Sequence, residues 1–363
     1  MDLLPHPFRR LWPGYRIVIF MPNWVGDAVM ATPTLRALRH HFGTVSRLVG
    51  IARPNVIGVL EGCRFLDELW PFDHRSPDNA VRAKAVAARM RRRRFHLAVL
   101  LTDNVRTAEL ARAGSARRRI GYARNGRDHL LTEPLGPPGA NGEWPRAVAV
   151  DYYLGIARAL GCPVGNPRME IATRPQDEAG ASAAFAALGL PENGSVIALN
   201  SSGAYGGAKL WPDEYFAELA RRIATELGRH ALVICGPEER DRARQICRAA
   251  GHPNVAHMAG QDVSLGLTKA CLRRCAALVT TDSGPRHIAA AFGLPVIALF
   301  GPTAPEWTDT HYPIESWLRI PVECGPCQQK VCPLEHHRCM RGLSVDTVMS
   351  ELRRALARTG ALP

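Results

Sequence analysis

The stretch VTTDSGPRHIAAAFGLPVIALFGPT, from Val279 to Thr303, predicts a strand, a helix and a second strand in close succession. The apolar residues before Asp282 and the run PVIALFG are typical of buried strands, whereas GPRHIAAAF between them is typical of a helix. Pro285 supports a helix start, because proline is well tolerated in the first helical turn. Two strands joined by a helix pair in parallel through a right-handed crossover. The stretch therefore predicts an α/β fold with a parallel sheet.

The same alternation of strands and helices runs through both halves of the chain. We expect strands at RIVIF, SRLVGIA, LDELWPF, HLAVLLT and RRIGYA in the first half and at SVIALN, HALVICG, ALVTTD and PVIALFG in the second, with helices such as TPTLRALRHHF and DEYFAELARRIATEL between them. Each half then forms a Rossmann-like, doubly wound domain. The predicted domains are residues 1–172 and 173–343, with a linker in Asn166–Gly180 and a closing helix, capped by Ser344, in 344–363.

The composition is that of an ordinary globular protein. Of 363 residues, 46% are hydrophobic and 22% charged, and a chain of this length suits two domains. No apolar run reaches the roughly 18 residues that a membrane helix needs, and MDLLPHPFRRLWPG is too broken by proline for a signal peptide. We therefore expect a cytoplasmic protein.

The positive charge is concentrated in the first half. Residues 1–171 contain 26 Lys and Arg and 14 Asp and Glu. Residues 172–363 contain 20 Lys and Arg and 19 Asp and Glu. A basic domain favours an acidic partner, such as nucleic acid, anionic lipid head groups or a phosphorylated glycan. The alternative is a solvated basic surface without a partner. No segment resembles a nucleic-acid-binding module, so we expect no nucleic acid partner.

Ligands of parallel sheets bind outside the carboxyl ends of the strands, so the two domains are expected to face a central cleft. Asp282 ends one strand, Ser283 and Gly284 form a tight turn, and His287 lies in the first turn of the next helix. The free N–H groups at that helix start favour a phosphate. The alternative is that Asp282 is a helix cap and His287 a packed core histidine.

Two further loops at strand ends have polar side chains suited to a nucleotide diphosphate. NSSGAYGGAKLWPDEYF offers Ser201, Ser202 and Lys209, although its spacing is not that of a P-loop. The alternative is a solvated Lys209, and we interpret the adjacent Trp211 as a core anchor. In CGPEERDRA, Glu238 or Glu239 suits hydrogen bonds from ribose hydroxyls, or the pair opens a helix.

Asp27 follows the strand RIVIF in the first domain, in the segment NWVGDAVM. A carboxylate at this strand end is suited to act as a general base on an acceptor hydroxyl, and partial burial beside Trp24 would raise its pKa. The alternative is that Asp27 is a helix N-cap.

Ten cysteines in such a chain favour thiols or a metal over disulfides. Six are scattered and are interpreted as small buried hydrophobic residues. The other four lie in CGPCQQKVCPLEHHRCM, which spaces them as Cys324-x2-Cys327-x4-Cys332-x6-Cys339 with His336 and His337 among them. The segment predicts either a structural zinc or iron–sulfur site or a free-thiol loop packed under the closing helix.

Four segments together resemble glycosyltransferase family 9, in particular its ADP-heptose:lipopolysaccharide heptosyltransferase II group. They are NWVGDAVMATPTLRALR, AKLWPDEYFAELA, TDSGPRHIAAAFGLPVIALFGPT and CPLEHHRCM, in the same order as in the family and spread over both domains. The resemblance implies a GT-B fold with the acceptor in the first domain and ADP-heptose in the second. Two features depart from the family pattern: Pro285, where a bulkier residue is frequent, and the loop NSSGAYGGAKLW, which matches only in outline.

The resemblance also implies roles for individual residues. The reaction would be inverting transfer of L-glycero-D-manno-heptose onto the heptose/Kdo inner core of lipopolysaccharide, with Asp27 as the base. Lys209 would grip the diphosphate, and an acidic residue, Glu238 or Glu239, would meet the ribose. The diphosphate and the sugar would also be held by the DSG turn and the following histidine, that is by Asp282, Ser283, Gly284 and His287.

No metal or other cofactor is expected, because Lys209, His287 and helix N-termini would supply the positive field for the leaving ADP. The expected partners are ADP-heptose, a lipid A/Kdo/heptose inner-core acceptor and the anionic inner face of the cytoplasmic membrane, where the protein would lie peripherally. Arg106, Arg124 and Arg127 are candidates for acceptor contacts. Two alternatives stay open: a related GT-B transferase or nucleotide-sugar epimerase using another sugar, and a non-catalytic protein that binds nucleotide sugar or lipopolysaccharide.

Overall fold

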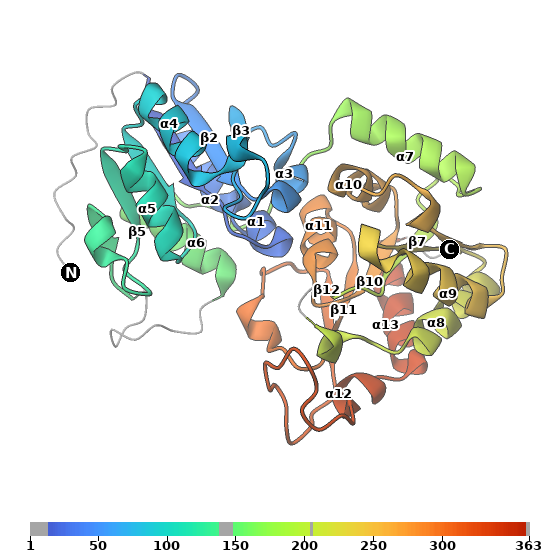
Figure 1. The fold of residues 1–363 in the computed structure, drawn as a ribbon. Coiled ribbons are helices and arrows are strands. Elements are labelled where there is room, and N and C mark those ends of the chain that lie inside the picture. The colour runs from blue at the N-terminus through green and yellow to red at the C-terminus, as the bar shows by residue number, and fades with distance from the viewer. Residues whose placement is uncertain (1–13, 138–147, 204–205, 361–363) are drawn as a thin grey trace. The chain divides into compact units, whose positions relative to one another are not determined.

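The protein, described from a computed structural model, divides into two compact units, Met1–Ala172 (unit 1) and Thr173–Pro363 (unit 2). The structure describes residues 14–137, 148–203 and 206–360. Each unit contains one six-stranded parallel sheet with helices on its faces (Figure 1). The prediction of two doubly wound parallel sheets is therefore confirmed.

The sheet of unit 1 has the strand order β3-β2-β1-β4-β5-β6. Its central strand pairs in register with both neighbours, Ile17 with Leu48 on one side and with Leu97 on the other. The strands are β1 (Arg16–Phe20), β2 (Arg47–Ala52), β3 (Glu68–Pro71), β4 (Leu97–Leu100), β5 (Arg118–Tyr122) and β6 (Glu133–Leu135). The helices are α1 (Val25–Met30), α2 (Thr32–Phe42), α3 (Pro54–Leu60), α4 (Ala83–Arg93), α5 (Val105–Ala113) and α6 (Ala149–Ala159), with short 3₁₀ turns η1 (Asn79–Val81) and η2 (Asp128–Leu130).

Unit 2 repeats the plan with the order β12-β11-β10-β7-β8-β9. The strands are β7 (Val196–Asn200), β8 (His230–Ile234), β9 (Val255–His257), β10 (Ala277–Thr281), β11 (Val296–Phe300) and β12 (Glu315–Arg319). The helices are α7 (Pro175–Ala187), α8 (Asp213–Leu227), α9 (Arg240–Ala250), α10 (Leu265–Arg273), α11 (Gly284–Phe292), α12 (Arg338–Arg341) and α13 (Val345–Arg358). The 3₁₀ turns are η3 (Gly207–Lys209), η4 (Pro237–Glu239), η5 (Met258–Gly260) and η6 (Pro305–Trp307).

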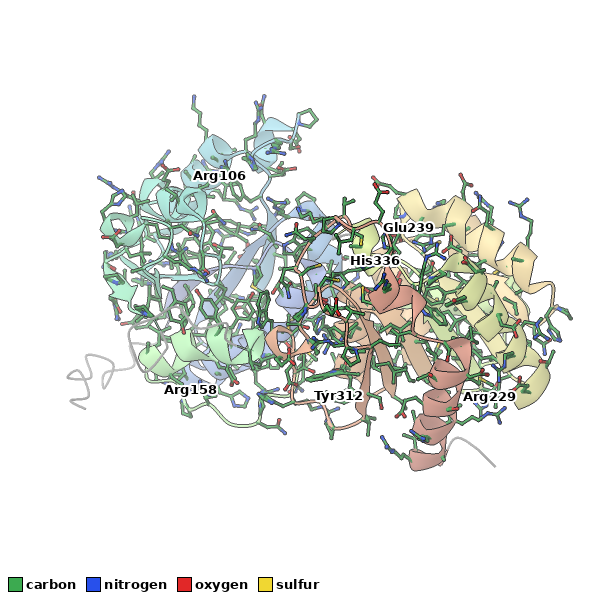
Figure 2. The ribbon with its side chains drawn as sticks, turned by 90° about the horizontal axis from the view of Figure 1, so that it is seen from below. Arg106, Arg158, Arg229, Glu239, Tyr312 and His336 are labelled. Atoms are coloured by element: carbon green, nitrogen blue, oxygen red, sulfur yellow. The ribbon has the colours of Figure 1, made fainter. Side chains whose placement is uncertain are left out.

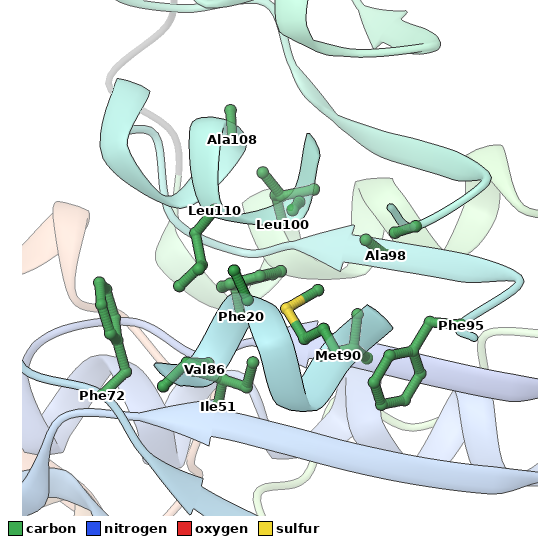
Figure 3. Close-up of a cluster of buried hydrophobic side chains, with 14 of the residues drawn as sticks. Phe20, Ile51, Phe72, Val86, Met90, Phe95, Ala98, Leu100, Ala108 and Leu110 are labelled. Atoms are coloured by element: carbon green, nitrogen blue, oxygen red, sulfur yellow. The ribbon is translucent and has the colours of Figure 1, made fainter. Parts of the chain in front are cut away.

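The core of unit 1 explains why its strands are apolar along their whole length. A parallel sheet is covered on both faces, so alternate residues of one strand enter two different layers. Val18 and Phe20 of β1 belong to a cluster that also contains Met90 of α4, Leu110 of α5 and Phe95, which lies between α4 and β4. Figure 3 shows Phe20, Met90, Phe95 and Leu110 of this cluster. Helix α6 packs instead with α1 and α2. Right-handed crossovers place these two sets of helices on opposite faces of the sheet.

The expected strands of both halves are present, and three that the sequence analysis did not predict lie at or toward sheet edges. These are β6 and β9, of three residues each, and β12, which reads ESWLR and pairs in parallel with β11. They are short or polar, so they have no continuous apolar run. The closing helix is confirmed as α13, where the Ser344 side chain accepts a hydrogen bond from the Thr347 N–H.

The linker prediction is wrong in its second half. Residues 166–172 form no helix or strand, and an Arg36 Nη donates to the backbone carbonyl of Arg168 at 2.8 Å. From Pro175, however, the chain forms α7, because proline occupies the first turn and the Asp177 carboxylate accepts the Arg174 N–H at 2.9 Å. Proline and the acidic residues that suggested a linker are helix-start signals here. No helix in the described part of the chain is long and apolar enough to cross a membrane.

We predict that Met90→Ala lowers the free energy of unfolding of unit 1 by about 2–5 kcal/mol, because it opens a cavity in a closely packed layer. The Met90 side chain is fully buried. Native-state hydrogen exchange of the β1 and β4 amides measures the effect. Lys84→Ala, an exposed change on the same helix, is the control and should alter stability by no more than about 0.5 kcal/mol. A loss below 1 kcal/mol in Met90→Ala would contradict the packing described.

Candidate functional site

A buried carboxylate organises the carboxyl edge of the sheet in unit 2. Asp282 directly follows β10, and its Oδ2 accepts hydrogen bonds from Lys209 Nζ at 2.8 Å and Thr303 Oγ1 at 2.9 Å. Its Oδ1 accepts a hydrogen bond from an Arg286 Nη at 3.2 Å. Burial alone would raise the pKa of Asp282, but the charges of Lys209 and Arg286 hold it well below its usual range. Asp282 is therefore a permanent anion inside the protein.

This arrangement excludes two simpler interpretations of the site. The N-cap of α11 is Ser283 and not Asp282, whose carboxylate is engaged by two cations. Lys209 is only 8% exposed and is not a solvated loop lysine. Its Nζ also donates to the Asp282 carbonyl oxygen at 3.0 Å. The loop after β7 is thus fixed to the end of β10.

Arg286 is a central residue that the sequence analysis did not single out. Its side chain is 0% exposed, and its guanidinium binds Glu315 of β12 through two bonds, at 2.6 and 2.8 Å. Together with the contact to Asp282, this joins the start of α11 to the edge strand. The sequence did contain a signal for this ion pair. Arg286 lies four residues after Asp282, in the first turn of a predicted buried helix, and a buried cation requires a counter-charge.

The serines of the site lie on neighbouring loops that are hydrogen-bonded to each other. Asn200, the last residue of β7, donates to Ser283 Oγ at 2.8 Å, and Ser202 Oγ donates to Asn200 Oδ1 at 2.7 Å. Ser201 is buried beside them in the chain. Gly284 begins α11, with Pro285 in its first turn. The structure thus brings Ser201, Ser202 and the DSG turn to one edge of one sheet.

His287 is buried, as the core-histidine alternative requires. Burial and the neighbouring Arg286 cation lower the pKa of His287 to about 3, so its imidazole is neutral at physiological pH. Its Nδ1 is buried and has no hydrogen-bond partner within the described residues. An unsatisfied buried polar atom costs about 1–3 kcal/mol, which a packed core histidine normally avoids. The position therefore suits a residue that gains a partner when a ligand binds.

The two acidic residues after β8 differ in their surroundings. Glu239, which is labelled in Figure 2, accepts the Gly236 N–H at 2.7 Å, so it stabilises the start of η4 as a helix-opening residue. Glu238 is exposed at the same strand end. Of the two, Glu238 is the side chain oriented to solvent, and its contact with a ribose stays a prediction.

In unit 1, Asp27 lies in the first turn of α1, at the carboxyl edge of the sheet. The N-cap of this helix is Trp24, and no side chain caps it, so the interpretation of Asp27 as an N-cap is wrong. The Asp27 Oδ1 instead accepts a hydrogen bond from Tyr153 Oη of α6 at 3.1 Å. Tyr153 was missed because it lies more than 100 residues away in the sequence.

A basic cavity of about 110 Å³ opens at the same edge of unit 1. It lies at the carboxyl ends of β1 to β4, and its polar lining comes from Asn23, Arg53, His74, Asn104, Arg106 and Thr107. Burial and the cations of Arg106 and Arg75 lower the pKa of His74. No Asp or Glu is among the described residues that line the cavity. The cavity is therefore suited to an anionic group.

The three arginines proposed for acceptor contacts are in different environments. Arg106 is exposed on α5 (Figure 2), and Arg124 is exposed in the loop after β5. Arg127 is fully buried and donates to the Tyr122 and Thr102 carbonyl oxygens and to Asp103. The acceptor prediction for Arg127 is therefore wrong, because its guanidinium is used to hold the loop after β5 to β4.

The four C-terminal cysteines line one small cavity of about 20 Å³ together with His336 and His337. Within the described residues, no group of three or more His, Cys, Asp or Glu side chains is arranged to hold a metal ion. The segment packs against two loops of the site: the Ala208 N–H donates to the Lys330 carbonyl at 3.0 Å, and the Gln328 N–H donates to the Pro302 carbonyl at 2.8 Å. The segment therefore supports the loops that carry Lys209 and Thr303. Whether its cysteines hold zinc or an iron–sulfur cluster, or are free thiols, stays a prediction.

Comparison with known families assigns the chain. Residues 83–338, more than half of its length, match the model of glycosyltransferase family 9 (heptosyltransferase). The chain belongs to glycosyltransferase family 9. It is 22% identical to lipooligosaccharide heptosyltransferase 2 of Campylobacter jejuni over 93% of this chain and 98% of that protein. It is 25% identical to lipopolysaccharide heptosyltransferase 2 of Escherichia coli K12, over 81% of this chain and 84% of the relative.

The family assignment confirms the resemblance seen in the sequence and makes the chain a glycosyltransferase. Among solved structures, it is similar to E. coli ADP-heptose lipopolysaccharide heptosyltransferase II, with a TM-score of 0.77 and 21% identity over 95% of this chain and 100% of that one. This likeness confirms the GT-B fold. The roles of the individual residues in this family 9 enzyme stay predictions.

We predict that Asp282→Asn lowers the free energy of unfolding of unit 2 by about 3–5 kcal/mol, because it removes the carboxylate that pairs with the buried Lys209 and one of the two carboxylates that pair with the buried Arg286, whose bonds to Glu315 remain. Hydrogen exchange of the β7 and β10 amides measures the effect. Asp346→Asn is the matched control, since Asp346 pairs with Arg222 at 2.6 Å on the surface, where such a pair contributes at most about 1 kcal/mol. Equal effects of the two substitutions would contradict the account.

Proposed function

We propose that this family 9 enzyme transfers L-glycero-D-manno-heptose from ADP-heptose to the heptose/Kdo inner core of lipopolysaccharide, with inversion at the anomeric carbon. Family membership supports heptosyl transfer. The observation that carries the proposal is the pair of carboxylates after central strands, Asp282 in unit 2 and Asp27 in unit 1, each in surroundings suited to a different role.

Unit 2 is the proposed donor site. Lys209 is held as a fixed positive charge by Asp282, and the N-terminus of α11 lies at the same strand edge. Fixed cations and helix N-termini stabilise phosphate oxygens. His287 Nδ1, which lacks a partner in the described structure, would gain one from the donor. In support, a structurally similar E. coli heptosyltransferase has been solved with ADP (TM-score 0.74, 17% identity over 94% of this chain and 99% of that one).

Unit 1 is the proposed acceptor site. The basic cavity lined by Arg53, His74 and Arg106 suits the carboxylates and phosphates of an inner-core glycan. Asp27, in the first turn after β1, would remove the proton of the acceptor hydroxyl as the oxygen attacks the anomeric carbon. The bond to the ADP oxygen would break in the same step, with the negative charge taken up at the phosphates by Lys209. This chemistry uses no metal or organic cofactor.

The acceptor is lipid-linked, so we propose the anionic inner face of the cytoplasmic membrane as a further partner. Helix α4 ends in the exposed residues Arg91, Arg92 and Arg93, followed by the exposed Arg94. A cluster of arginines is attracted to anionic lipids by about 1 kcal/mol for each residue near the surface.

We predict that Asp27→Asn lowers kcat by about 10²–10⁴-fold, the range that a general base contributes, because the amide cannot accept the proton. ADP release in the presence of a heptose-primed inner-core acceptor measures turnover, and calorimetry should show unchanged ADP-heptose binding. Asp128→Asn, which removes an exposed carboxylate of the same unit, is the control for loss of one charge. Turnover within tenfold of wild type in Asp27→Asn would exclude the base role.

We predict that Arg106→Gln raises the KM for the acceptor about tenfold or more and leaves the KM for ADP-heptose unchanged. A hydrogen bond to a charged group contributes about 1.5–3 kcal/mol, and about 1.4 kcal/mol is a factor of ten in affinity. Arg112→Gln is the matched control, because Arg112 is exposed at the other end of α5. If both variants change the acceptor KM equally, the cavity does not bind the acceptor.

A further inference from the structure

Tyr153 makes a contact with Asp27 that neither the sequence motifs nor the family assignment explains. Its Oη donates a hydrogen bond to Asp27 Oδ1 at 3.1 Å, from helix α6 to the first turn of α1. The tyrosine is 7% exposed. A buried hydroxyl that points at the proposed base is placed to control the orientation and the charge of the carboxylate.

The phenol of Tyr153 acts only as a donor over the whole range of ordinary pH. Burial, and then the negative charge of Asp27, raise the pKa of Tyr153 well above its usual value. A neutral donor favours the ionised form of the carboxylate that accepts from it, and therefore lowers the pKa of that carboxyl. It also fixes one carboxylate oxygen and, with it, the plane of the carboxylate group.

The adjacent residue anchors helix α6 to the same edge of the sheet. Tyr152 Oη donates to Asp103 Oδ2 at 2.7 Å, and Asp103 follows β4, the neighbour of β1. The Tyr152 ring stacks on Tyr122 of β5 at 4.2 Å between centroids. Two successive tyrosines of α6 thus bind two carboxylates that follow adjacent strands.

Close packing under α6 leaves the helix little freedom to shift. Tyr122 Oη donates to the Tyr152 carbonyl oxygen at 3.0 Å. A Cβ at Gly155 would collide with the same hydroxyl oxygen, so a residue without a side chain is required there. The position of Tyr153 is therefore fixed by contacts that do not involve Asp27, which means that the tyrosine can position the carboxylate rather than follow it.

We propose that Tyr153 is the positioning residue of the catalytic base: it orients Asp27 and keeps it ionised, so that the carboxylate is ready to take the acceptor proton. The inference rests on the proposed function of Asp27. In the reaction the proton of the acceptor hydroxyl passes to Asp27, and an electron pair of the acceptor oxygen forms the bond to the anomeric carbon. ADP leaves with the electron pair of the broken bond. Tyr153 retains its own proton throughout.

The charged groups on the elements that pack against α1 bear on the pH behaviour of Asp27. Helices α2, α3 and α6 contact α1. Helix α3 has no titratable side chain and is flanked by Arg53 and Glu61.

The acidic and phenolic groups near Tyr153 are Asp27, Asp103 and Tyr152, and α6 also carries Asp151 and Arg158. Helix α2 has four titratable side chains. Arg36 is paired with Glu170 and Arg39 with Asp67, and the other two are the histidines His40 and His41.

The test is the pH dependence of transfer by Tyr153→Phe, which removes one hydroxyl and keeps the ring. Loss of a hydrogen bond to a charged group corresponds to a shift of about one pH unit or more. We expect the acidic limb of the kcat profile to move up by that amount, kcat at its plateau to fall about tenfold, and ADP-heptose affinity to stay unchanged. An acidic limb at the wild-type position would overturn the proposal.

Tyr152→Phe is the matched control, because it removes the neighbouring hydroxyl from the other carboxylate, Asp103. It should leave the acidic limb in place even if it loosens the helix, so an equal shift in both variants would also overturn the proposal.

As a direct measurement, the Asp27 carboxyl pKa is followed by ¹³C NMR and should rise only in Tyr153→Phe. Absence of acceptor-dependent transfer by wild type, or full turnover by Asp27→Asn, would count against the proposed function instead.

Discussion

The Asp282 carboxylate, buried between Lys209 and Arg286, is the interaction on which unit 2 depends most. An ion in the protein interior is tolerated only with counter-charges and hydrogen bonds in good geometry. Those partners come from four places in the chain: the loop after β7, the first turn of α11, Thr303 after β11 and, through Arg286, Glu315 of β12. The need to satisfy one anion thus holds together the loops that form the candidate donor site.

Asp27 lies at the carboxyl edge of the sheet in unit 1, in the first turn of the helix that follows the central strand, and its surroundings differ from those of Asp282. A carboxylate held between two cations has its pKa depressed so far that it cannot take a proton, as Asp282 illustrates. Asp27 accepts a hydrogen bond from the neutral phenol of Tyr153, which orients the carboxylate. The carboxyl edges of the two sheets thus carry carboxylates in different surroundings, which fits the roles proposed for them: a fixed charge in unit 2 and a proton acceptor in unit 1.

The parts of this structure that depend on local sequence were predictable, and those that depend on distant pairs were not. Strands such as Arg16–Phe20 and helices such as Asp213–Leu227 follow from apolar runs and periodicity, and their bounds agree with the pattern. The edge strand β12 has no such run, since ESWLR is stabilised by pairing with β11. The linker prediction failed from Pro175 because polar and proline residues mark helix starts as well as loops.

The candidate site shows the same division. Asp27, Lys209 and the DSG turn were found because they follow strands, where parallel sheets bind ligands. The pairing of Lys209 with Asp282 could not be derived, since 73 residues separate them. The contact of Tyr153 with Asp27 spans 126 residues and depends on the packing of α6, which no local pattern encodes. Arg127 was named as a candidate for acceptor contacts, and only its burial and its hydrogen bonds show that it belongs to the interior.

The most direct test of the account is a single-turnover reaction of the purified protein with ADP-heptose and a heptose-primed inner-core acceptor, with the new glycosidic bond analysed by NMR. Attack by a hydroxyl that a positioned carboxylate has activated displaces ADP in line. The account therefore predicts that ADP is released only when acceptor is present, and that the product has the anomeric configuration opposite to that of the donor. Release of ADP without acceptor, or a product that retains the donor configuration, would contradict it.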